Sequence, residues 1–350
     1  MTEAGGGEGV PCPCGVVLVG SIPLADADSV FRMAARHLGR HVKRLPDGET
    51  GSRTNWIAWQ LDVFKRTSGL LAETVEAGYV KRERFRVKAG VDPASIRFPA
   101  LGYADAAIDS WRAFDALQAG GGIDRAVKFQ VCLPTPLAPI QSYLFPESQA
   151  VLEPAYEAVM LAELDRILAA IPHDRLAIQW DTAIEFAVLE GVMPSFLADP
   201  ESGIFERLTR LGNHVPANVQ LGFHLCYGDA GHRHFKEPED AGKLVRVANH
   251  LARSLVRSLD WLHLPVPRNR DDDAYFRPLA DLRLSEATEL YLGLVHLTDG
   301  VEGTLRRIAA ARTYAPRFGV GTECGMGRRP PDTIAALMAL HSQVSVPFSA

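Results

Sequence analysis

Residues 219–228, VQLGFHLCYG, are mostly apolar or aromatic and end in glycine, a pattern typical of a buried strand in a parallel sheet. Seven further runs of this character occur along the chain, and longer amphipathic segments separate them. These runs are GVVLVGSIP (15–23), HVKRLPDGE (41–49), VKFQVCLP (127–134), RLAIQWD (175–181), WLHLPVP (261–267), ELYLGLVHLTD (289–299) and RFGVGTECG (317–325). Eight strands that alternate with helices predict an α/β fold, a single (β/α)8 TIM barrel.

Segments with helical periodicity lie between these runs, for example residues 154–172 and 239–255. A doubly wound sheet is the alternative architecture, although it usually contains fewer strands. We expect residues 15–350 to form one barrel domain and the Gly-rich residues 1–14 to form a flexible N-terminal tail. Residues 95–105, SIRFPALGYAD, do not fit the alternation and are predicted to form an inserted hairpin.

The composition limits the partners and the compartment. The 350 residues include 37 Lys or Arg and 42 Asp or Glu, a net charge of −5, which argues against nonspecific binding to nucleic acid or anionic membranes. No apolar run is long enough to span a membrane, and the N-terminus does not resemble a secretory signal. Five cysteines are too few for a disulfide scaffold, so we expect free thiols in the cytoplasm. The sequence leaves a homo-oligomer open.

Polar side chains gather where the predicted strands end. Because the strands of a barrel all end at one mouth, these side chains are expected to converge on an active site. The alternative is that strand ends are polar only because loops are polar. The residues are Ser21, Asp47, Glu49, Asp181, His224, Cys226, His296, Asp299, Glu323 and Cys324.

Three of these residues predict a metal site. His224 and Cys226 are two residues apart in a strand, so their side chains point to the same side. Cys324, at the end of a later strand, can add a second sulfur across the mouth. One imidazole and two thiolates suit zinc, and three protein ligands leave one position open for a substrate. The alternative is a pair of core thiols beside a hydrogen-bonded histidine.

Two sulfur ligands also indicate the kind of reaction. Thiolates donate charge to zinc and weaken its ability to activate water. Such a site suits a substrate thiol, which the metal holds as a thiolate at neutral pH. The sequence therefore favours alkylation of a small-molecule thiol by an alkyl donor over hydrolysis.

Five segments, in this order, carry a resemblance to a known family: VGSIP (19–23), LPDGETGSRTNW (45–56), LAIQWD (176–181), His224-x-Cys226 and ECGMGRR (323–329). Together they resemble the C-terminal catalytic barrel of cobalamin-independent methionine synthase, in the superfamily that includes uroporphyrinogen decarboxylase. The resemblance extends over about residues 15–345. It implies a zinc-bearing (β/α)8 barrel that moves a methyl group from a folate to homocysteine. Relatives of that family alkylate other thiols.

The resemblance also implies roles for individual residues. His224, Cys226 and Cys324 match the zinc ligands of the family. Ser21, Glu49 and Asp181 match positions that hold the amino-acid part of homocysteine, and His296 matches a histidine proposed to assist methyl transfer.

The sequence departs from the family at three points. Pro265 occupies the position of a glutamate zinc ligand, and His263 or the acidic residues 271–273 are candidates to replace it, unless substrate and water fill the position. Thr182 follows Asp181 where the family has a second acidic residue. The second barrel of the full-length synthase is absent, which puts a folate donor in doubt.

Two other functions remain open at this point. The first is a metal-assisted lyase that breaks a C–S or C–C bond of a small acid at the same site. The second is a zinc-free barrel of the uroporphyrinogen decarboxylase type that binds a small molecule. Metal content distinguishes the second from the alkyl-transfer hypothesis, and a panel of thiols and alkyl donors distinguishes the first.

Overall fold

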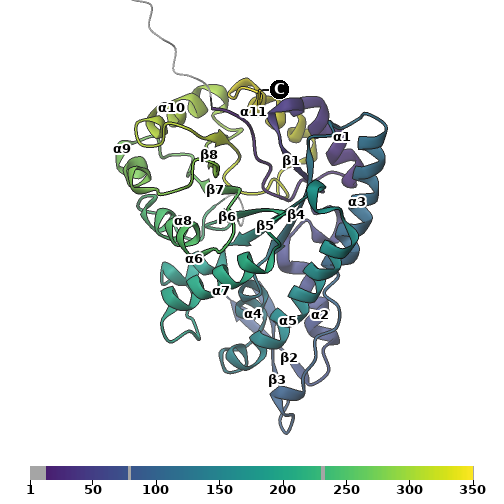
Figure 1. The fold of residues 1–350 in the computed structure, drawn as a ribbon. Helices are drawn as coiled ribbons and strands as arrows, with labels where there is room; N and C mark the ends of the chain where they lie inside the picture. The colour runs from purple at the N-terminus through teal and green to yellow at the C-terminus, as the bar shows by residue number, and fades with distance from the viewer. Residues whose placement is uncertain (1–12, 78–79, 230–232, 350) are drawn as a thin grey trace, which may run out of the picture.

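The computed structural model describes residues 13–77, 80–229 and 233–349. Its centre is a seven-stranded sheet in the order β1-β4-β5-β6-β7-β8-β9, in which all neighbouring strands are parallel. Helices surround this sheet (Figure 1). The strands are β1 (Arg44–Pro46), β4 (Lys128–Pro134), β5 (Leu176–Thr182), β6 (Gln220–Leu225), β7 (Trp261–Pro265), β8 (Glu289–Gly293) and β9 (Gly319–Val320). The predicted α/β fold with a parallel sheet is confirmed, whereas the count of eight strands stays a prediction.

The first predicted strand forms a bridge rather than a full strand. Val16 makes an isolated parallel bridge with Val320, and the Val17 N–H donates to the Val320 carbonyl over 2.9 Å. On the other side, the Val16 N–H donates to the His41 carbonyl, shortly before β1, over 2.7 Å. The segment therefore lies between β9 and the start of β1. β9 is only two residues long, which leaves too few partners for a longer ladder.

The register of the central strands places the polar residues in one row. Asp181 on β5 pairs with His224 on β6, and His224 pairs with His263 on β7. Side chains directly opposite one another in neighbouring strands point to the same face. All three residues lie near the C-terminal ends of their strands, so the fold brings them to the same end of the sheet.

The longer helices bury an apolar face each against the sheet or against one another. On α1, for example, the buried residues include Val30, Phe31 and Ala34, and Asp26 caps the helix by accepting the Ser29 N–H. The helices are α1 (Ala27–Leu38), α2 (Leu61–Arg66), α3 (Tyr103–Ala119), α4 (Leu137–Tyr143), α5 (Pro146–Ala170), α6 (Ile184–Leu189), α7 (Pro200–His214), α8 (Gly242–Ser254), α9 (Asp273–Phe276), α10 (Gly300–Arg312) and α11 (Ile334–Gln343).

The expectation of a hairpin at residues 95–105 is wrong. These residues follow a short 3-10 turn and lead into α3, and the hairpin lies earlier, in the antiparallel strands β2 (Leu70–Ala77) and β3 (Val80–Val87). It projects from the end of the molecule near α2 and α5 (Figure 1). Its second strand, VKRERFRV, contains five charged residues among eight, so it lacks the continuous apolar run that marked the central strands.

The N-terminal tail is described only at its end. Cys14 forms an isolated bridge with Val346, and the Pro13 carbonyl accepts the Val346 N–H. Residues 1–12, which make up most of the predicted flexible tail, lie outside the described residues. Within the described ranges, no helix is both long enough and apolar enough to cross a membrane.

Candidate metal centre and substrate cavity

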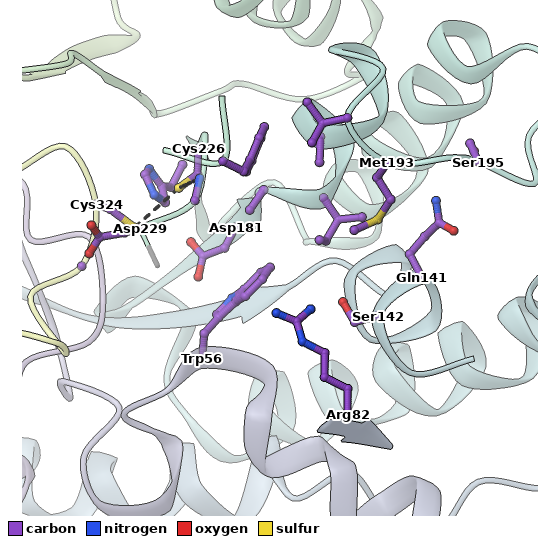
Figure 2. A pocket seen from close by; sticks show the side chains of 18 of the residues that line it. Trp56, Arg82, Gln141, Ser142, Asp181, Met193, Ser195, Cys226, Asp229 and Cys324 are labelled. Atoms are coloured by element: carbon purple, nitrogen blue, oxygen red, sulfur yellow. Dashed lines mark hydrogen bonds between the residues drawn. The ribbon is translucent and has the colours of Figure 1, made fainter. Parts of the chain in front are cut away.

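The structure brings His224, Cys226 and Cys324 together. One ligand atom from each lies within 4.8 Å of the others, and no other cluster of three or more metal-binding residues occurs within the described part of the chain. The two sulfurs are 3.5 Å apart, and the Gly228 N–H donates to the Cys226 sulfur over 3.2 Å. Figure 2 shows the two cysteines at one side of a large cavity. The ligand atoms of His224, Cys226 and Cys324 are therefore close enough together to bind one ion.

The protonation and hydrogen bonds of His224 fit a metal ligand. Its Nε2 is buried and has no hydrogen-bond partner within the described residues, which is costly unless an ion fills the position. Its Nδ1 lies 2.7 Å from Nδ1 of His263. Burial lowers the pKa of His224 well below its usual range and that of His263 to about 3, so both rings are neutral. If Nε2 binds a metal, Nδ1 carries the proton and donates it to His263.

His263 therefore supports His224 and does not lie in the ligand cluster. The other candidates to replace the glutamate of the family do not lie there either. Pro265 is buried at the end of β7, where its carbonyl accepts the Tyr275 hydroxyl over 2.8 Å. Asp271 pairs with Arg306, and Asp272 pairs with Arg270 and caps α9, so both carboxylates are engaged elsewhere.

This arrangement gives a prediction for His263. Replacement by leucine should weaken zinc binding by roughly 10- to 100-fold, the usual effect of losing a residue that orients a metal ligand. Replacement by asparagine, whose side-chain oxygen can accept near the position of Nδ1, should retain most of the affinity. Competition with a chromophoric chelator measures both values. Equal affinity of the leucine variant and the wild type would contradict the supporting role.

A cavity of about 950 Å³ opens beside the three residues. Its wall includes most of the residues that the sequence predicted for the site: Ser21, Glu49, Asp181, His224, Cys226 and Cys324. At its far end the wall is formed by the hairpin, with Arg82 and Arg84, and by the residues that follow α6, such as Met193 (Figure 2). The cavity is in the size range that holds drug-sized ligands, so it has room for more than one small amino acid.

Two carboxyl groups lie in this wall. The Asp47 carboxylate accepts the Glu49 N–H over 2.9 Å and so holds Glu49 in a left-handed conformation with φ 47°. Burial and, next, the charge of Asp47 raise the pKa of Glu49 to about 8. Burial and then the charge of Glu49 raise the pKa of Asp181 well above its usual range. Two carboxyls with raised pKa values in one cavity form a site that a cation would stabilise.

Thr182 does not replace the missing acidic residue of the family. Its hydroxyl donates to the His224 carbonyl over 3.0 Å, between neighbouring strands. The residue therefore fixes β6 beside β5 and adds no charge to the cavity. Asp181 instead accepts the side-chain N–H of Gln179 over 2.8 Å.

The loop after β9 packs tightly across Ser21. A Cβ atom on Gly325 would lie 2.3 Å from Oγ of Ser21, and one on Gly327 would lie 2.9 Å from its Cβ. The Met326 N–H donates to the Ser21 carbonyl over 2.6 Å. The two glycines of ECGMG thus allow the segment that carries Cys324 to lie against the segment that carries Ser21.

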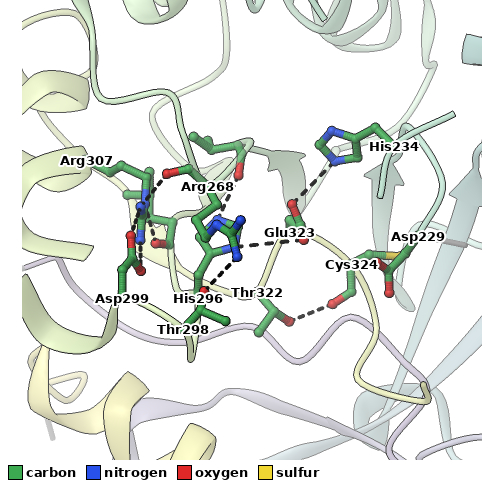
Figure 3. A network of polar contacts seen from close by, with 12 residues as sticks. Asp229, His234, Arg268, His296, Thr298, Asp299, Arg307, Thr322, Glu323 and Cys324 are labelled. Atoms are coloured by element: carbon green, nitrogen blue, oxygen red, sulfur yellow. Dashed lines mark hydrogen bonds and ion pairs between the residues drawn. The ribbon is translucent and has the colours of Figure 1, made fainter. Parts of the chain in front are cut away.

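His296 lies outside the cavity wall. It is buried, its Nε2 donates to the Val266 carbonyl over 3.0 Å, and its Nδ1 lies 3.8 Å from a Glu323 oxygen (Figure 3). The other Glu323 oxygen lies 3.5 Å from Nε2 of His234. Burial lowers the pKa of His296 to about 3, and burial raises that of Glu323 to about 7. The predicted strand-end residues Glu323 and His296 therefore form a second cluster next to Cys324.

Several residues of the site escaped sequence analysis. Trp56 projects into the cavity from a left-handed conformation with φ 48°, and Asp229 and Arg328 line the cavity near the cysteines. Trp56 and Arg328 stand inside two of the segments that carry the family resemblance, LPDGETGSRTNW and ECGMGRR. That location is the signal that could have identified them.

The sequence matches no protein-family model and no curated protein. Solved structures do match. The structure of a B12-independent methionine synthase from Shewanella sp. W3-18-1, in complex with selenomethionine, has a TM-score of 0.62 and 14% identity over 95% of this chain and 96% of that one. The chain shares the fold of B12-independent methionine synthase. The predicted resemblance is thereby confirmed at the level of the fold.

Two further structures extend the comparison. A putative vitamin-B12-independent methionine synthase from Listeria monocytogenes has a TM-score of 0.57 and 13% identity, over 96% of this chain and 99% of that one. A methyltransferase from Methanosarcina mazei has a TM-score of 0.54 and 12% identity, over 95% of this chain and 94% of that one. All three chains are matched over nearly their whole length, so the methionine synthase fold accounts for almost all of this chain.

Proposed function

We propose that this protein transfers a methyl or other alkyl group to or from the thiol of an amino acid, with a zinc ion at the cysteine pair. The observation that carries the proposal is the meeting of His224, Cys226 and Cys324 at the wall of a cavity that also contains two buried carboxyls. The names of the three similar structures agree with this chemistry.

The residues present fit zinc. The set contains two sulfurs and one imidazole nitrogen, the donor types that zinc prefers, and the nitrogen is buried without another partner. When bound, zinc holds a substrate thiol as the more nucleophilic thiolate. Three protein ligands leave a position for that sulfur, and the Gly228 N–H already donates to Cys226 as it would to a thiolate.

The carboxyl pair is proposed to hold the ammonium group of the amino acid. Glu49 and Asp181 are close enough for the charge of one to raise the pKa of the other, so a positive charge between them relieves a repulsion. The Ser21 hydroxyl offers a hydrogen bond to the carboxylate of the amino acid. Selenomethionine, the ligand named for the Shewanella structure, is an amino acid of this kind.

His296 is proposed to act through Glu323 and not by direct contact with the substrate. The Val266 carbonyl fixes its Nε2 proton, which leaves Nδ1 directed toward Glu323. Glu323 immediately precedes Cys324. The pair can therefore hold a proton beside the metal ligand and keep the loop that carries it in place.

The architecture that supports this function is proposed to be a closed (β/α)8 barrel over residues 15–350, with residues 15–19 as its eighth strand position. The bridge of Val16 with Val320, the hydrogen bond of Val17 to Val320 and the hydrogen bond of Val16 to His41 support this closure. In such a barrel, active sites lie at the C-terminal ends of the strands, where the cysteine pair lies here.

The proposal is tested by metal analysis followed by calorimetry with thiols. We expect about one zinc per chain in protein purified without chelator, as for a site of three protein ligands. We expect homocysteine to bind the zinc-loaded protein with release of a proton, because the bound sulfur must be a thiolate. Titration in two buffers of different ionisation enthalpy measures that proton.

The outcomes separate the alternatives. Protein without any transition metal would favour a zinc-free small-molecule-binding barrel. Protein that contains zinc but binds no thiol would overturn alkyl transfer and favour the metal-assisted lyase. If thiols bind, incubation with a panel of alkyl donors, including methyltetrahydrofolate, then identifies the donor through the thioether that forms.

A further inference from the structure

The cavity has few positive charges, and they lie at two separate places. Of the residues that the structure describes, three lysine or arginine side chains line the cavity. Arg82 and Arg84 belong to β3 in the hairpin, at the end near Gln141 and Ser142 (Figure 2). Arg328 comes from the loop after β9, four residues beyond Cys324. The cysteine pair and the carboxyl pair therefore have one nearby cationic side chain in the cavity wall.

The local backbone fixes the position of Arg328. The close contacts of Gly325 and Gly327 with Ser21 hold this loop against the segment that carries Ser21. Nη2 of Arg328 donates to Oδ1 of Asn55 over 3.2 Å, which attaches the guanidinium to the neighbouring loop. Arg328 thus directly follows the glycine that contacts Ser21, whose hydroxyl is proposed to meet the substrate carboxylate.

The guanidinium of Arg328 has N–H donors that can bind a further ligand. Its Nη1 forms an ion pair with Oδ2 of Asp229 at 3.7 Å, a separation beyond hydrogen-bond distance, and about a third of its side chain is exposed. A guanidinium has five N–H donors, arranged so that two of them can bind one carboxylate side by side. Its positive charge reaches the carboxyl pair, since it counteracts the rise in the pKa of Glu49.

An amino acid in this cavity needs such a cation. Its ammonium is proposed to lie between Glu49 and Asp181, and its carboxylate must then lie within a few ångströms of two acidic groups. Without a positive charge the carboxylate would be repelled, and a serine hydroxyl alone does not offset that repulsion. Arg53, the other arginine near Glu49, already forms an ion pair with Asp47 at 2.7 Å.

We propose that Arg328 binds the α-carboxylate of the substrate and restricts the protein to thiols that are complete α-amino acids. This inference rests on the proposed function, because it assumes an amino-acid thiol at the cysteine pair. It adds a recognition site for a carboxylate and the exclusion of amines that lack one.

The experiment compares two thiols that differ only in the carboxylate. Homocysteine and 3-amino-1-propanethiol share the thiol, the ammonium and the chain between them. Calorimetry on the zinc-loaded wild type should show homocysteine binding on the order of 10- to 100-fold more tightly, the effect of one charge-assisted hydrogen-bonded pair. Arg328→Met should remove this preference by weakening homocysteine alone.

Two further variants keep the result interpretable. Arg328→Lys retains the charge but loses the paired donors, and it should restore part of the preference. Arg112→Met removes the same charge from the exposed surface of α3, outside the cavity, and should leave both affinities unchanged. Zinc content and melting temperature are measured for each variant, so that loss of metal or fold is recognised separately.

The inference is overturned if the wild type binds both thiols equally, or if Arg328→Met lowers the affinity for both to the same extent. Either result would show that Arg328 does not bind the carboxylate. Binding of neither thiol to the zinc-loaded wild type would instead overturn the proposed function, and this inference with it.

Discussion

Protein with serine in place of Cys324 should be purified without zinc. Serine replaces a soft thiolate by a hydroxyl that stays protonated at neutral pH, and it leaves two protein ligands, His224 and Cys226. The loss of zinc affinity should exceed the roughly 10- to 100-fold that is typical of losing a residue that orients a metal ligand. Thiol binding and proton release should disappear together with the metal. Elemental analysis and calorimetry measure the two effects.

Cys132→Ser is the matched control. Cys132 is also a free cysteine near the site, but its thiol donates to the Val19 carbonyl over 3.2 Å and it is absent from the ligand cluster. This variant should keep about one zinc per chain. Full zinc retention in Cys324→Ser, with an unchanged melting temperature, would contradict the assignment of Cys324 as a ligand. Equal loss in both variants would indicate a general effect on folding.

The cluster of His224, Cys226 and Cys324 could be predicted because it depends on strand geometry. The period of two in a strand places His224 and Cys226 on one side, and the parallel arrangement brings the loop of Cys324 to the same end. The structure bears out this juxtaposition, with the two sulfurs 3.5 Å apart. The same reasoning placed Glu49 and Asp181 at the cavity, because Glu49 lies three residues after β1 and Asp181 is next to last in β5.

The features that could not be predicted depend on register and on loops. His263 meets His224 only because the two residues pair in neighbouring strands, and no local pattern fixes that register. The hairpin escaped notice because its second strand is mostly charged, and a search for apolar runs does not detect such a strand. His296 follows the end of β8 as expected, but the Val266 carbonyl turns its ring away from the cavity wall.

Binding of methionine should strengthen as the pH rises from about 6 to about 8, by roughly tenfold for each pH unit. The reason is the raised pKa of Glu49, about 8, which keeps its carboxyl protonated over this range in the free protein. The ammonium of the ligand requires the ionised carboxylate, so binding must remove that proton. Removal of this proton becomes easier as the pH approaches the pKa of Glu49. The gain in affinity should level off above that pKa.

Methionine is the appropriate ligand because its thioether has no proton to lose. The deprotonation of a thiol at the zinc ion therefore does not contribute to the pH dependence. Calorimetry at several pH values on zinc-loaded protein gives the profile, with zinc content measured at each pH. In Glu49→Gln the pH dependence should become weaker over this range, because the charge of Glu49 then no longer raises the pKa of Asp181. Zinc should be retained because Glu49 lies outside the ligand cluster. Affinity that falls as the pH rises in the wild type, or a slope in Glu49→Gln as steep as in the wild type, would show that another group controls binding of the ammonium.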